Sequence, residues 1–399
     1  MTDPTALSAT DAIDALRAGS LTALDLTQAY LERIAAISEG SHAWLHVDSA
    51  TALTAAHASD QRRARGEAYH PLDGVPIGIS DNIEVAGMPL TAGMATRRRR
   101  MAQEDAHCVA KLRRTGAVIL GKLNLDEAGW GGNGDNPHFG GIRNPHDAGS
   151  ASGGAACGAA FAVAERMCAL AIATDSVGSM RVPAAWCGVA GFKPSHARVS
   201  QRGLVTVSHR LDQAGPVARS CTDLSAVFQQ ISGVDALDAH SRTVPLAHLE
   251  HDSQRLRIGV IGELSALGVS DAIIAAFADT CERLRSLLPN QEIIAFNDYD
   301  FVHTRSAAQL LCSSEMNLTH ADDLQTQPDS FSGRLREFLA SAVRASAVEL
   351  AAALQRLELT RLKARRVFSQ VDVLLAPSTP TSACSFGTPA PEHIADLCS

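Results

Sequence analysis

The sequence predicts an α/β protein with a mixed central β-sheet sandwiched between layers of α-helices. Two short apolar runs, GVPIGI at 74–79 and AVILGKL at 117–123, have the composition of buried strands. Between them, EDAHCVAKLRRTG at 104–116 has helical spacing of its apolar residues and ends in a glycine. Strands and helices that alternate over such short distances favour a sheet with helices on both faces.

The N-terminal segment 8–36 predicts two amphipathic helices. Gly19 provides the break between them, and Thr22 is a suitable N-cap for the second, because its hydroxyl can accept a hydrogen bond from a first-turn N–H group. The opening residues MTDPTALSATDAIDAL are acidic and helical in pattern, which is unlike a signal peptide.

Later segments add further strands, helices and a loop-rich region. Residues 127–160 are rich in glycine, asparagine and alanine, which is typical of close-packed loops around a site. Strands are expected at 169–175, 256–264 and 371–380, the last of them buried, and helices over 271–288 and 332–369. No repeat or linker divides the chain. We therefore expect one domain over 1–399, with N-terminal helices at 8–36, a core at about 70–225 and a C-terminal part at 255–399.

Charge and cysteine content argue against several functions. Lys and Arg number 35 and Asp and Glu 43, which gives a net charge of -8 without long runs of one sign. This balance argues against a nucleic-acid or anionic-membrane surface. The nine cysteines are scattered without a C-x-x-C pair, which is typical of reduced thiols in a cytosolic protein. No apolar stretch reaches membrane-spanning length, so we expect a cytoplasmic protein.

Metal and nucleotide motifs are also missing from the sequence. It contains no H-E-x-x-H, no Walker loop and no G-x-G-x-x-G on a strand–helix turn. We therefore expect neither a metal nor a cofactor.

A tight turn in TDSVGSMR (174–181) has the local form of a nucleophile loop. Ser179 follows a glycine, so the preceding backbone N–H groups can converge on an oxyanion. In most proteins a Gly-Ser pair is simply a turn, so this pattern alone does not identify a catalytic serine.

A set of longer motifs is more specific. PLDGVPIGISDNIEVAGMPLTAG (71–93), GAVILGKLNLDEAGWG (116–131), RNPHD (143–147) and ATDSVGSMRVPAAWCGVAGFKPS (173–195) occur in this order, followed by LDQAGPVARSCTDL (211–224). In these motifs the sequence resembles the amidase signature family, closest to its biuret hydrolases and glutamyl-tRNA amidotransferase A-subunits. The resemblance implies one large α/β/α domain and a Ser–cis-Ser–Lys triad, in which the nucleophile's proton passes through the middle serine to a neutral lysine.

The resemblance places the nucleophile at Ser179. It places the oxyanion hole on the backbone of Ser176, Val177 and Gly178. Val177 stands where the family has a glycine, and a β-branched residue resists positive φ. Asp175 and Arg181 flank this turn, and we expect them to hold it by hydrogen bonds and charge.

Two of the three triad positions lack the residue that the resemblance implies. Ser80 stands at the family's lysine position, and a hydroxyl cannot serve as the terminal base at neutral pH. Counted without gaps, the middle serine falls on Ala155; a four-residue insertion would place it on Ala151 instead. Either alignment leaves the proton relay without a hydroxyl. Loss of a member of such a coupled unit lowers the rate by roughly 10³–10⁶.

Five side chains are candidates for replacing the lost groups, and each also has a structural interpretation. Cys157 could attack the substrate or simply fill a small buried site, and Ser152 could relay a proton. Asp81 lies beside the position of the lost lysine and would therefore lose a positive neighbour. It could then serve as a base, or it could simply cap a turn. His138 and His146 lie in the loop-rich region, where either could act as a base. The Lys193 side chain is expected to lie away from the triad.

Three functions therefore remain open. The first is hydrolysis of a small amide- or urea-type C–N bond through Ser179 or a rebuilt site. The second is a catalytically inactive binding or scaffolding subunit, and the third is a non-hydrolytic reaction in the same pocket. Each implies a small-molecule ligand, and the resemblance adds a homodimer or a small companion subunit.

Overall fold

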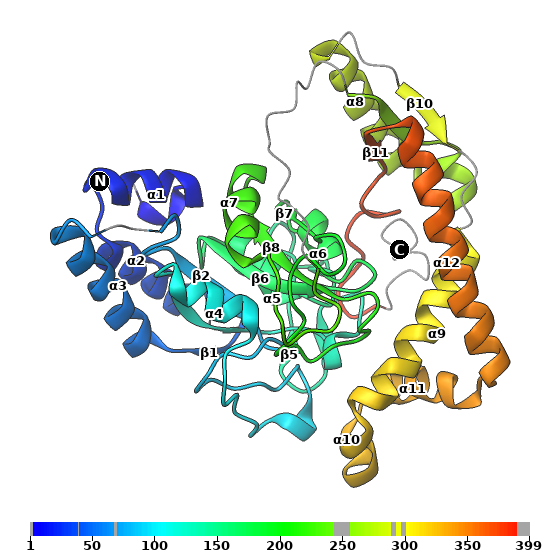
Figure 1. Cartoon of the computed structure of the whole chain (residues 1–399), viewed down its shortest axis with the longest axis horizontal. Coiled ribbons are helices and arrows are strands. Elements are labelled where there is room, and N and C mark those ends of the chain that lie inside the picture. The colour runs from blue at the N-terminus through cyan, green and yellow to red at the C-terminus, as the bar shows by residue number, and fades with distance from the viewer. Residues whose placement is uncertain are drawn as a thin grey trace.

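The computed structural model describes residues 3–38, 40–67, 70–242, 256–288, 293–296 and 301–388. A larger body holds the N-terminal helices and a six-stranded sheet, and the C-terminal helices and a small second sheet extend beside it (Figure 1).

The main sheet is mixed, as predicted. Its strand order is β1 (Trp44–Val47), β3 (Val118–Leu123), β2 (Pro76–Ser80), β6 (Leu170–Asp175), β8 (Gln213–Ala218) and β7 (Ala190–Gly191). The β3, β2 and β6 strands are parallel, whereas β1, β8 and β7 pair antiparallel with their neighbours. Every residue of β3, β2, β6 and β8 is buried, which explains why these strands are mostly apolar on both faces.

Helices pack against this sheet and supply its core. They are α1 (Ala9–Ala18), α2 (Ala23–Ile37), α3 (Ser49–Ala64), α4 (His107–Arg114), α5 (Cys157–Ala164), α6 (Arg181–Trp186) and α7 (Cys221–Ile231). The α3 helix contacts β3, α5 contacts β2, β6 and β8, and α7 contacts β8. The first two helices meet as predicted: Gly19 ends α1 with φ 70°, and the Thr22 side chain accepts a hydrogen bond from Asp25 N at the start of α2.

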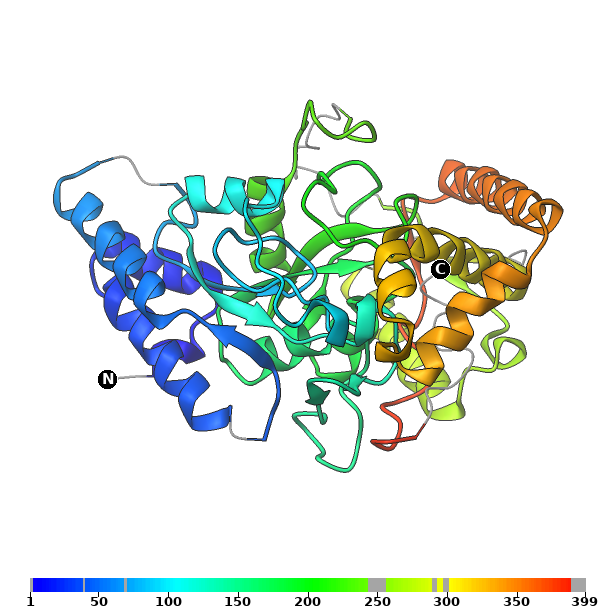
Figure 2. The ribbon, with the colours of Figure 1, turned by 90° about the horizontal axis from the view of Figure 1, so that it is seen from below.

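The C-terminal part contains a second, parallel sheet of β10 (Ile293–Phe296), β9 (Ile258–Ile261) and β11 (Val373–Leu375). Together with α8 (Asp271–Leu287) it has an apolar cluster of its own. The remaining helices are α9 (Phe301–Thr319), α10 (Ala321–Thr326), α11 (Gly333–Arg344) and α12 (Ala347–Gln370), and Figure 2 shows them grouped at one end of the molecule. One domain over the whole chain stays a prediction.

The helical pattern expected at 332–369 is confirmed as two helices, because Ala345 is extended and Ser346 caps α12 in a capping box that includes Glu349. One expectation for the C-terminal part is wrong. The strand at 371–380 is short and partly exposed rather than buried, since it lies at the edge of the small sheet.

Candidate active site

The candidate site lies where three parallel strands end at the same edge of the main sheet, a common location for ligand sites in α/β proteins. The β2 strand ends at Ser80, and the turn with Ser179 follows β6. Asn82 Nδ2 donates to Thr174 Oγ1 at 2.8 Å, which joins the ends of these two strands. The structure thus brings the lysine position and the candidate nucleophile to one edge.

The turn that carries Ser179 is organised by Asp175. This fully buried carboxylate accepts hydrogen bonds from the backbone N–H groups of Gly178 (2.8 Å), Met180 and Arg181 (both 3.2 Å). The Arg181 guanidinium also donates to it through Nε and Nη2, both at 2.9 Å. Burial opposes its ionisation, but the Arg181 charge and these donors hold the pKa of Asp175 well below its usual range. The carboxylate therefore fixes the shape of the turn.

The oxyanion positions are only partly available. The Gly178 N–H group is taken by Asp175, so the predicted donor at Gly178 is already engaged. Gly178 has φ 115°, whereas Val177 has no positive φ, so the β-branched residue fits this turn without strain. The backbone N–H groups of Ser176 and Val177 remain as candidate donors.

The resemblance places the proton relay at Ser80 and Ala155. Ser80 is buried, and its Oγ has no hydrogen-bond partner among the described residues. Ala156 N donates to Ser179 O at 2.8 Å, so Ala155 lies directly beside the nucleophile turn; its peptide bond with Gly154 is cis. Ala151 instead contacts Cys384 through its backbone N–H, so the gap-free alignment is the one that matches this arrangement.

Ser179 itself is half-buried, and its carbonyl accepts the Ala156 bond. Its Oγ forms no hydrogen bond to any of the described residues. The hydroxyl therefore lacks the hydrogen-bonded base that an activated serine requires.

Asp81 keeps a positive neighbour, contrary to expectation. Its Oδ1 lies 3.4 Å from Lys122 Nζ, and both side chains are fully buried. Thr91 donates to Oδ2 of Asp81 through its N–H group at 2.8 Å and also through its hydroxyl. Burial raises the pKa of Asp81, while Lys122 and Thr91 oppose this shift. These contacts fit the turn-capping interpretation.

Cys157 and Ser152 have structural surroundings. Cys157 is fully buried at the start of α5, and burial raises the pKa of its thiol well above the usual range, which disfavours the reactive thiolate. Ser152 is also buried, and its Oγ donates to the carbonyl of Ile142 at 2.8 Å.

The two histidines are engaged elsewhere. His146 Nε2 lies 2.9 Å from the carbonyl oxygen of Cys187. His138 Nε2 lies 2.8 Å from Glu127 Oε1, and Glu127 accepts the backbone N–H of Ser332 at 3.1 Å. The His138–Glu127 pair thus joins the loop-rich region to the start of α11.

Lys193 lies closer to the nucleophile turn than expected. Its Nζ donates to the carbonyl of Ser176 and is 3.8 Å from Asp175 Oδ1. The Ser176 hydroxyl donates to Asp212, whose pKa is raised to about 6 by burial despite that bond. The antiparallel register of Asp175 opposite Gln213 brings Asp212 to this place.

Sequence reasoning also missed Asp126, which follows β3 at the same edge. Its backbone N–H donates to the carbonyl of Ala155 at 2.9 Å. A sequence signal existed, because Asp126 follows a predicted strand just as the Ser179 turn does. The pairing of the strands, which places both ends together, was not available from one sequence.

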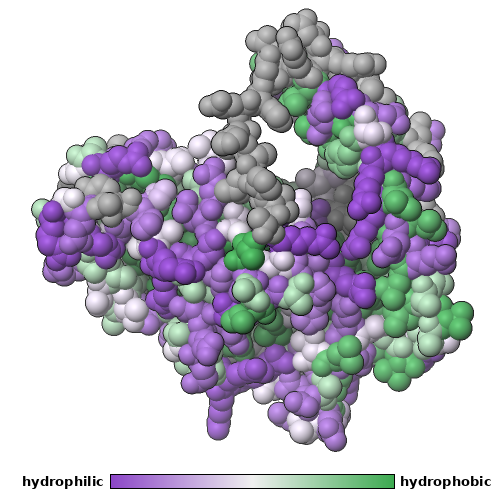
Figure 3. All heavy atoms as spheres, in the orientation of Figure 1, coloured by the Kyte–Doolittle hydropathy of each residue, from purple (hydrophilic) through white to green (hydrophobic). Residues whose placement is uncertain are grey.

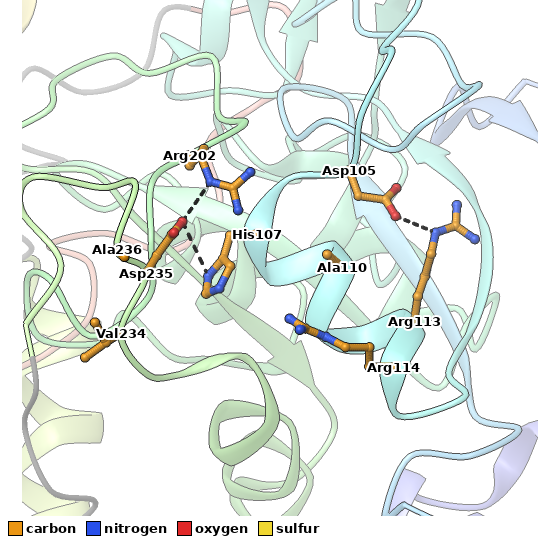
Figure 4. Close-up of a pocket in the computed structure, with 9 residues that line it drawn as sticks. All are labelled: Asp105, His107, Ala110, Arg113, Arg114, Arg202, Val234, Asp235 and Ala236. Atoms are coloured by element: carbon orange, nitrogen blue, oxygen red, sulfur yellow. Dashed lines mark hydrogen bonds and ion pairs between the residues drawn. The ribbon is translucent and has the colours of Figure 1, made fainter.

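A separate surface depression of about 550 Å³ contains none of the predicted site residues. Figure 4 shows it between α4 and the segment around Asp235. Arg202 lies 2.8 Å from Asp235, and Arg113 lies 2.9 Å from Asp105, so both carboxylates already have cationic partners.

The described residues contain no group of three or more His, Cys, Asp or Glu side chains arranged to hold a metal ion. Within the same ranges, no helix has both the length and the apolar character needed to cross a membrane.

The Amidase family model matches residues 25–397. The chain belongs to the amidase family. It is 32% identical to the glutamyl-tRNA(Gln) amidotransferase A-subunit of Streptomyces coelicolor over 433 aligned positions, which cover 100% of this chain and 87% of the relative. The corresponding protein of Roseiflexus castenholzii is 35% identical, over 98% of this chain and 86% of the relative.

Solved structures of amidase-family proteins share the fold. One, reported as a vestigial protein complex that reveals the origins of an s-triazine catabolic enzyme, has a TM-score of 0.90 and 30% identity, over 98% of this chain and 88% of that chain. A peptide amidase bound to the competitive inhibitor chymostatin has a TM-score of 0.79 and 26% identity, with the same coverage. The predicted family and fold class are confirmed.

Proposed function

We propose that this chain is a binding member of the amidase family that recognises a small amide- or urea-type compound at the carboxyl edge of its main sheet. Hydrolysis by Ser179 is slow or absent. The observation that carries this proposal is the contrast between the two sides of the site. The turn around Asp175 is held by several hydrogen bonds, whereas Ser80 and Ala155 provide no group that can accept the proton of Ser179.

The chemistry of serine supports this proposal. A serine hydroxyl attacks an amide only when a base lies within about 2.6–3.2 Å or is reached through one water molecule. Asp81 is paired with Lys122, and His146 is bonded to a backbone carbonyl. An oxyanion hole and substrate binding alone leave an acceleration on the order of 10³–10⁴ over water, far below that of a complete amidase.

The retained turn supports binding rather than a complete loss of the site. The Asp175 carboxylate accepts several backbone N–H groups and so holds the turn in one shape. In that shape the N–H groups of Ser176 and Val177 lie just before Ser179 and are candidates to donate to a carbonyl oxygen. An amide or urea provides that oxygen.

Hydrolysis through Ser179 is the second candidate function. It is favoured by the partial exposure of Ser179 on this turn.

Reaction with a fluorophosphonate probe, measured by intact-protein mass spectrometry, separates the two candidates. Binding without catalysis predicts that wild type and Ser179→Ala are equally unlabelled while both bind small amides in a calorimetric titration. Labelling of wild type that Ser179→Ala abolishes would contradict it in favour of the hydrolase. Failure of both proteins to bind any amide or urea would overturn both candidates.

We also propose a small companion subunit, because α12 is exposed along most of its length. Among its 24 residues only Ala353 is buried, and Leu359, Leu362 and Phe368 are each at least half exposed. Figure 3 shows apolar side chains on the side of the molecule where α9, α11 and α12 lie. Basic residues 361, 363, 365 and 366 accompany them, so a partner with an acidic and apolar surface is complementary.

The scattered thiols support a cytoplasmic location.

Native mass spectrometry of the protein purified from its own cells tests this partner. A companion subunit predicts an assembly heavier than the 42.0 kDa chain by less than one further chain. The double variant Leu359→Glu/Leu362→Glu should lose the additional mass, because these two exposed side chains are neighbours on one face of α12. A dimer of identical chains, or a single chain alone, would contradict the proposal.

A further inference from the structure

The surface depression of Figure 4 carries an excess of positive charge. Its volume is about 550 Å³. The charged residues in its wall, apart from histidine, are Asp105, Arg113, Arg114, Arg202 and Asp235. Three guanidinium groups thus face two carboxylates, at a place that none of the candidate active-site residues lines.

Both carboxylates of this wall are already used within the protein. Asp235 is 6% exposed, and both of its oxygens accept hydrogen bonds, one of them from Arg202 Nε at 2.8 Å. Asp105 Oδ1 accepts a backbone N–H group at 2.9 Å, and its Oδ2 lies 2.9 Å from Arg113 Nε. The acidic groups therefore hold the wall together and leave part of its positive charge without a counterion.

The three arginines keep N–H groups that a ligand can reach. Arg113 and Arg202 pair with the carboxylates through Nε, and their Nη1 and Nη2 atoms form no hydrogen bond to a described residue. None of these Nη atoms is fully buried, so they are accessible from the depression. Arg114 is exposed and has neither a hydrogen bond nor an ion pair in the described ranges. The depression therefore offers several unused donors of positive charge.

The spacing of residues on α4 places part of this wall on one helix face. The buried residues of α4 are Cys108, Val109 and Leu112. Residues His107, Ala110 and Arg114 are three and four positions apart, so they are neighbours on the opposite face. Ala110 lies between the other two and is small, so its methyl group leaves the floor of the depression open.

His107 shows the effect of the neighbouring positive charges. In Figure 4 the Arg114 side chain extends toward the His107 ring, and Arg202 lies on the other side of this ring. Burial lowers the pKa of His107, and the charges of Lys111, Arg202 and Arg114 lower it as well, against the opposing charge of Asp235. Its Nδ1 is buried 3.9 Å from Asp235, whereas its Nε2 is not fully buried. Surroundings that disfavour a cation favour an anion.

We propose that this depression binds a small phosphate monoester, with its dianionic phosphate between the guanidinium groups of Arg114 and Arg202. A guanidinium pairs with a phosphate through two parallel N–H···O bonds. A phosphate group has three oxygens and nearly two charges, which suits donors that come from different segments. At about 30 Å³ for each water molecule, the depression also has room for an attached organic group. This inference goes beyond the proposed function, because the site does not use Ser179.

A ligand-observed NMR titration of the full chain at pH 8 and constant ionic strength tests the site. The probes are phenyl phosphate, benzoate and benzyl alcohol. They share an aromatic ring and carry two, one and no negative charges at this pH. We expect phenyl phosphate to bind at least about tenfold more tightly than either of the others, since several charge-assisted hydrogen bonds form only with the dianion.

Variants assign the binding to this depression. Arg114→Gln should weaken phenyl phosphate at least about fivefold, because it removes one guanidinium. Ala110→Glu should weaken it at least about 20-fold, because it places a negative charge on the floor, and glutamate is compatible with a helix. The matched control is Arg283→Gln on α8, an exposed arginine whose loss changes the net charge equally. It should leave binding unchanged.

The titration of His107 provides a second measurement. Sulfate replaces the phosphate ester here, because it stays a dianion throughout the titration. Bound sulfate should raise the pKa of His107, since a negative charge offsets its positive neighbours. Spectra of histidine-labelled protein give the pKa, and His107→Gln assigns the signal. If Arg114 only stabilises the C-terminal end of α4, sulfate will not move this pKa, and the proposal is wrong.

The remaining outcomes are distinct. No binding of phenyl phosphate to wild type, or equal weakening by Arg114→Gln and Arg283→Gln, would overturn the site. Benzoate binding as tightly as phenyl phosphate would contradict a phosphate ligand. Arg114 is exposed, so its variant keeps the test valid if Ala110→Glu does not fold. Ser179→Ala should bind phenyl phosphate like wild type. Binding of phenyl phosphate without any binding of amides would contradict the proposed function alone, and the reverse result would contradict this site alone.

Discussion

Two buried carboxyl groups lie at the same edge of the main sheet, and their surroundings are opposite. Asp175, after β6, accepts three backbone N–H groups and the Arg181 guanidinium. Asp126, after β3, has an oxygen without a partner in the described part of the chain. Burial is similar at the two positions, so the Arg181 charge together with the hydrogen bonds decides that the pKa of Asp175 is low, whereas the pKa of Asp126 is high.

The difference separates two parts of the site. On the Asp175 side a hydrogen-bonded turn presents Ser179, although the Gly178 N–H group is already engaged by Asp175. The other side contains Ser80, whose hydroxyl has no partner among the described residues, and Asp126, with an oxygen that no described residue satisfies. These surroundings support the proposal of binding without rapid serine catalysis.

The largest expected effect comes from restoring the missing groups. If the turn is complete and only the relay is absent, the double variant Ser80→Lys/Ala155→Ser should raise amidase activity by at least about 10³-fold, since the relay acts as a unit. Each single variant should gain little. Release of ammonia from small amides provides the measurement. No gain on any amide would contradict the view that the turn itself is intact.

The next largest effect is expected at Asp175. Asp175→Asn removes the negative charge that Arg181 and several N–H groups share, so the free energy of unfolding should fall by about 3–5 kcal/mol. The pKa of Asp175 is lower in the folded protein than in the unfolded chain. Its carboxylate therefore stabilises the fold above about pH 4, and this stabilisation is lost as the pH falls through the pKa of the folded protein. Urea unfolding at pH 7 gives the comparison, with Asp105→Asn as control. A loss below about 1 kcal/mol would show that Asp175 does not hold the turn.

Asp126→Asn should act in the opposite direction at alkaline pH. Burial raises the pKa of Asp126 in the folded protein to about 7, whereas its pKa in the unfolded chain is about 4. Ionisation of Asp126 therefore destabilises the folded protein as the pH rises above about 4. The variant should therefore be more stable than wild type by about 1–3 kcal/mol at pH 8 and nearly equal to it at pH 4. Urea midpoints at the two pH values test this. A variant less stable than wild type at pH 8 would mean that Asp126 has a partner in the free protein.

The smallest effect is expected at Cys157. Because burial raises the pKa of this thiol, Cys157→Ser should leave amide binding within about twofold of wild type. Iodoacetamide should modify the exposed Cys221 in the folded protein and leave Cys157 untouched, as peptide mass spectrometry can show. Rapid modification of Cys157 would restore it as a candidate nucleophile.

The sequence by itself determined the family, the N-terminal helices and the strands near 74–79, 117–123 and 169–175, whereas β1 and α3 were not predicted. The missing triad groups stay a prediction. Apolar runs such as 74–79 and 169–175 predict strands because local pattern reports burial, and Ser80 and Ala155 can be read directly from the motifs. The periodicity at 332–369 predicts helix but does not locate the division at Ser346, because a capping residue inside a long helical pattern is a weak signal beside the periodicity around it.

Tertiary structure alone decided which charged groups meet. Lys122 reaches Asp81 from a neighbouring strand, Asp212 reaches Ser176 through an antiparallel pair, and Asp126 adjoins Ala155 across a loop. These partners are far apart in the chain, and no local pattern encodes the distance between them. The pKa of a buried carboxyl depends on its distances to neighbouring charges and hydrogen-bond donors. The sequence therefore specifies which titratable residues are present, and the tertiary structure determines their protonation states.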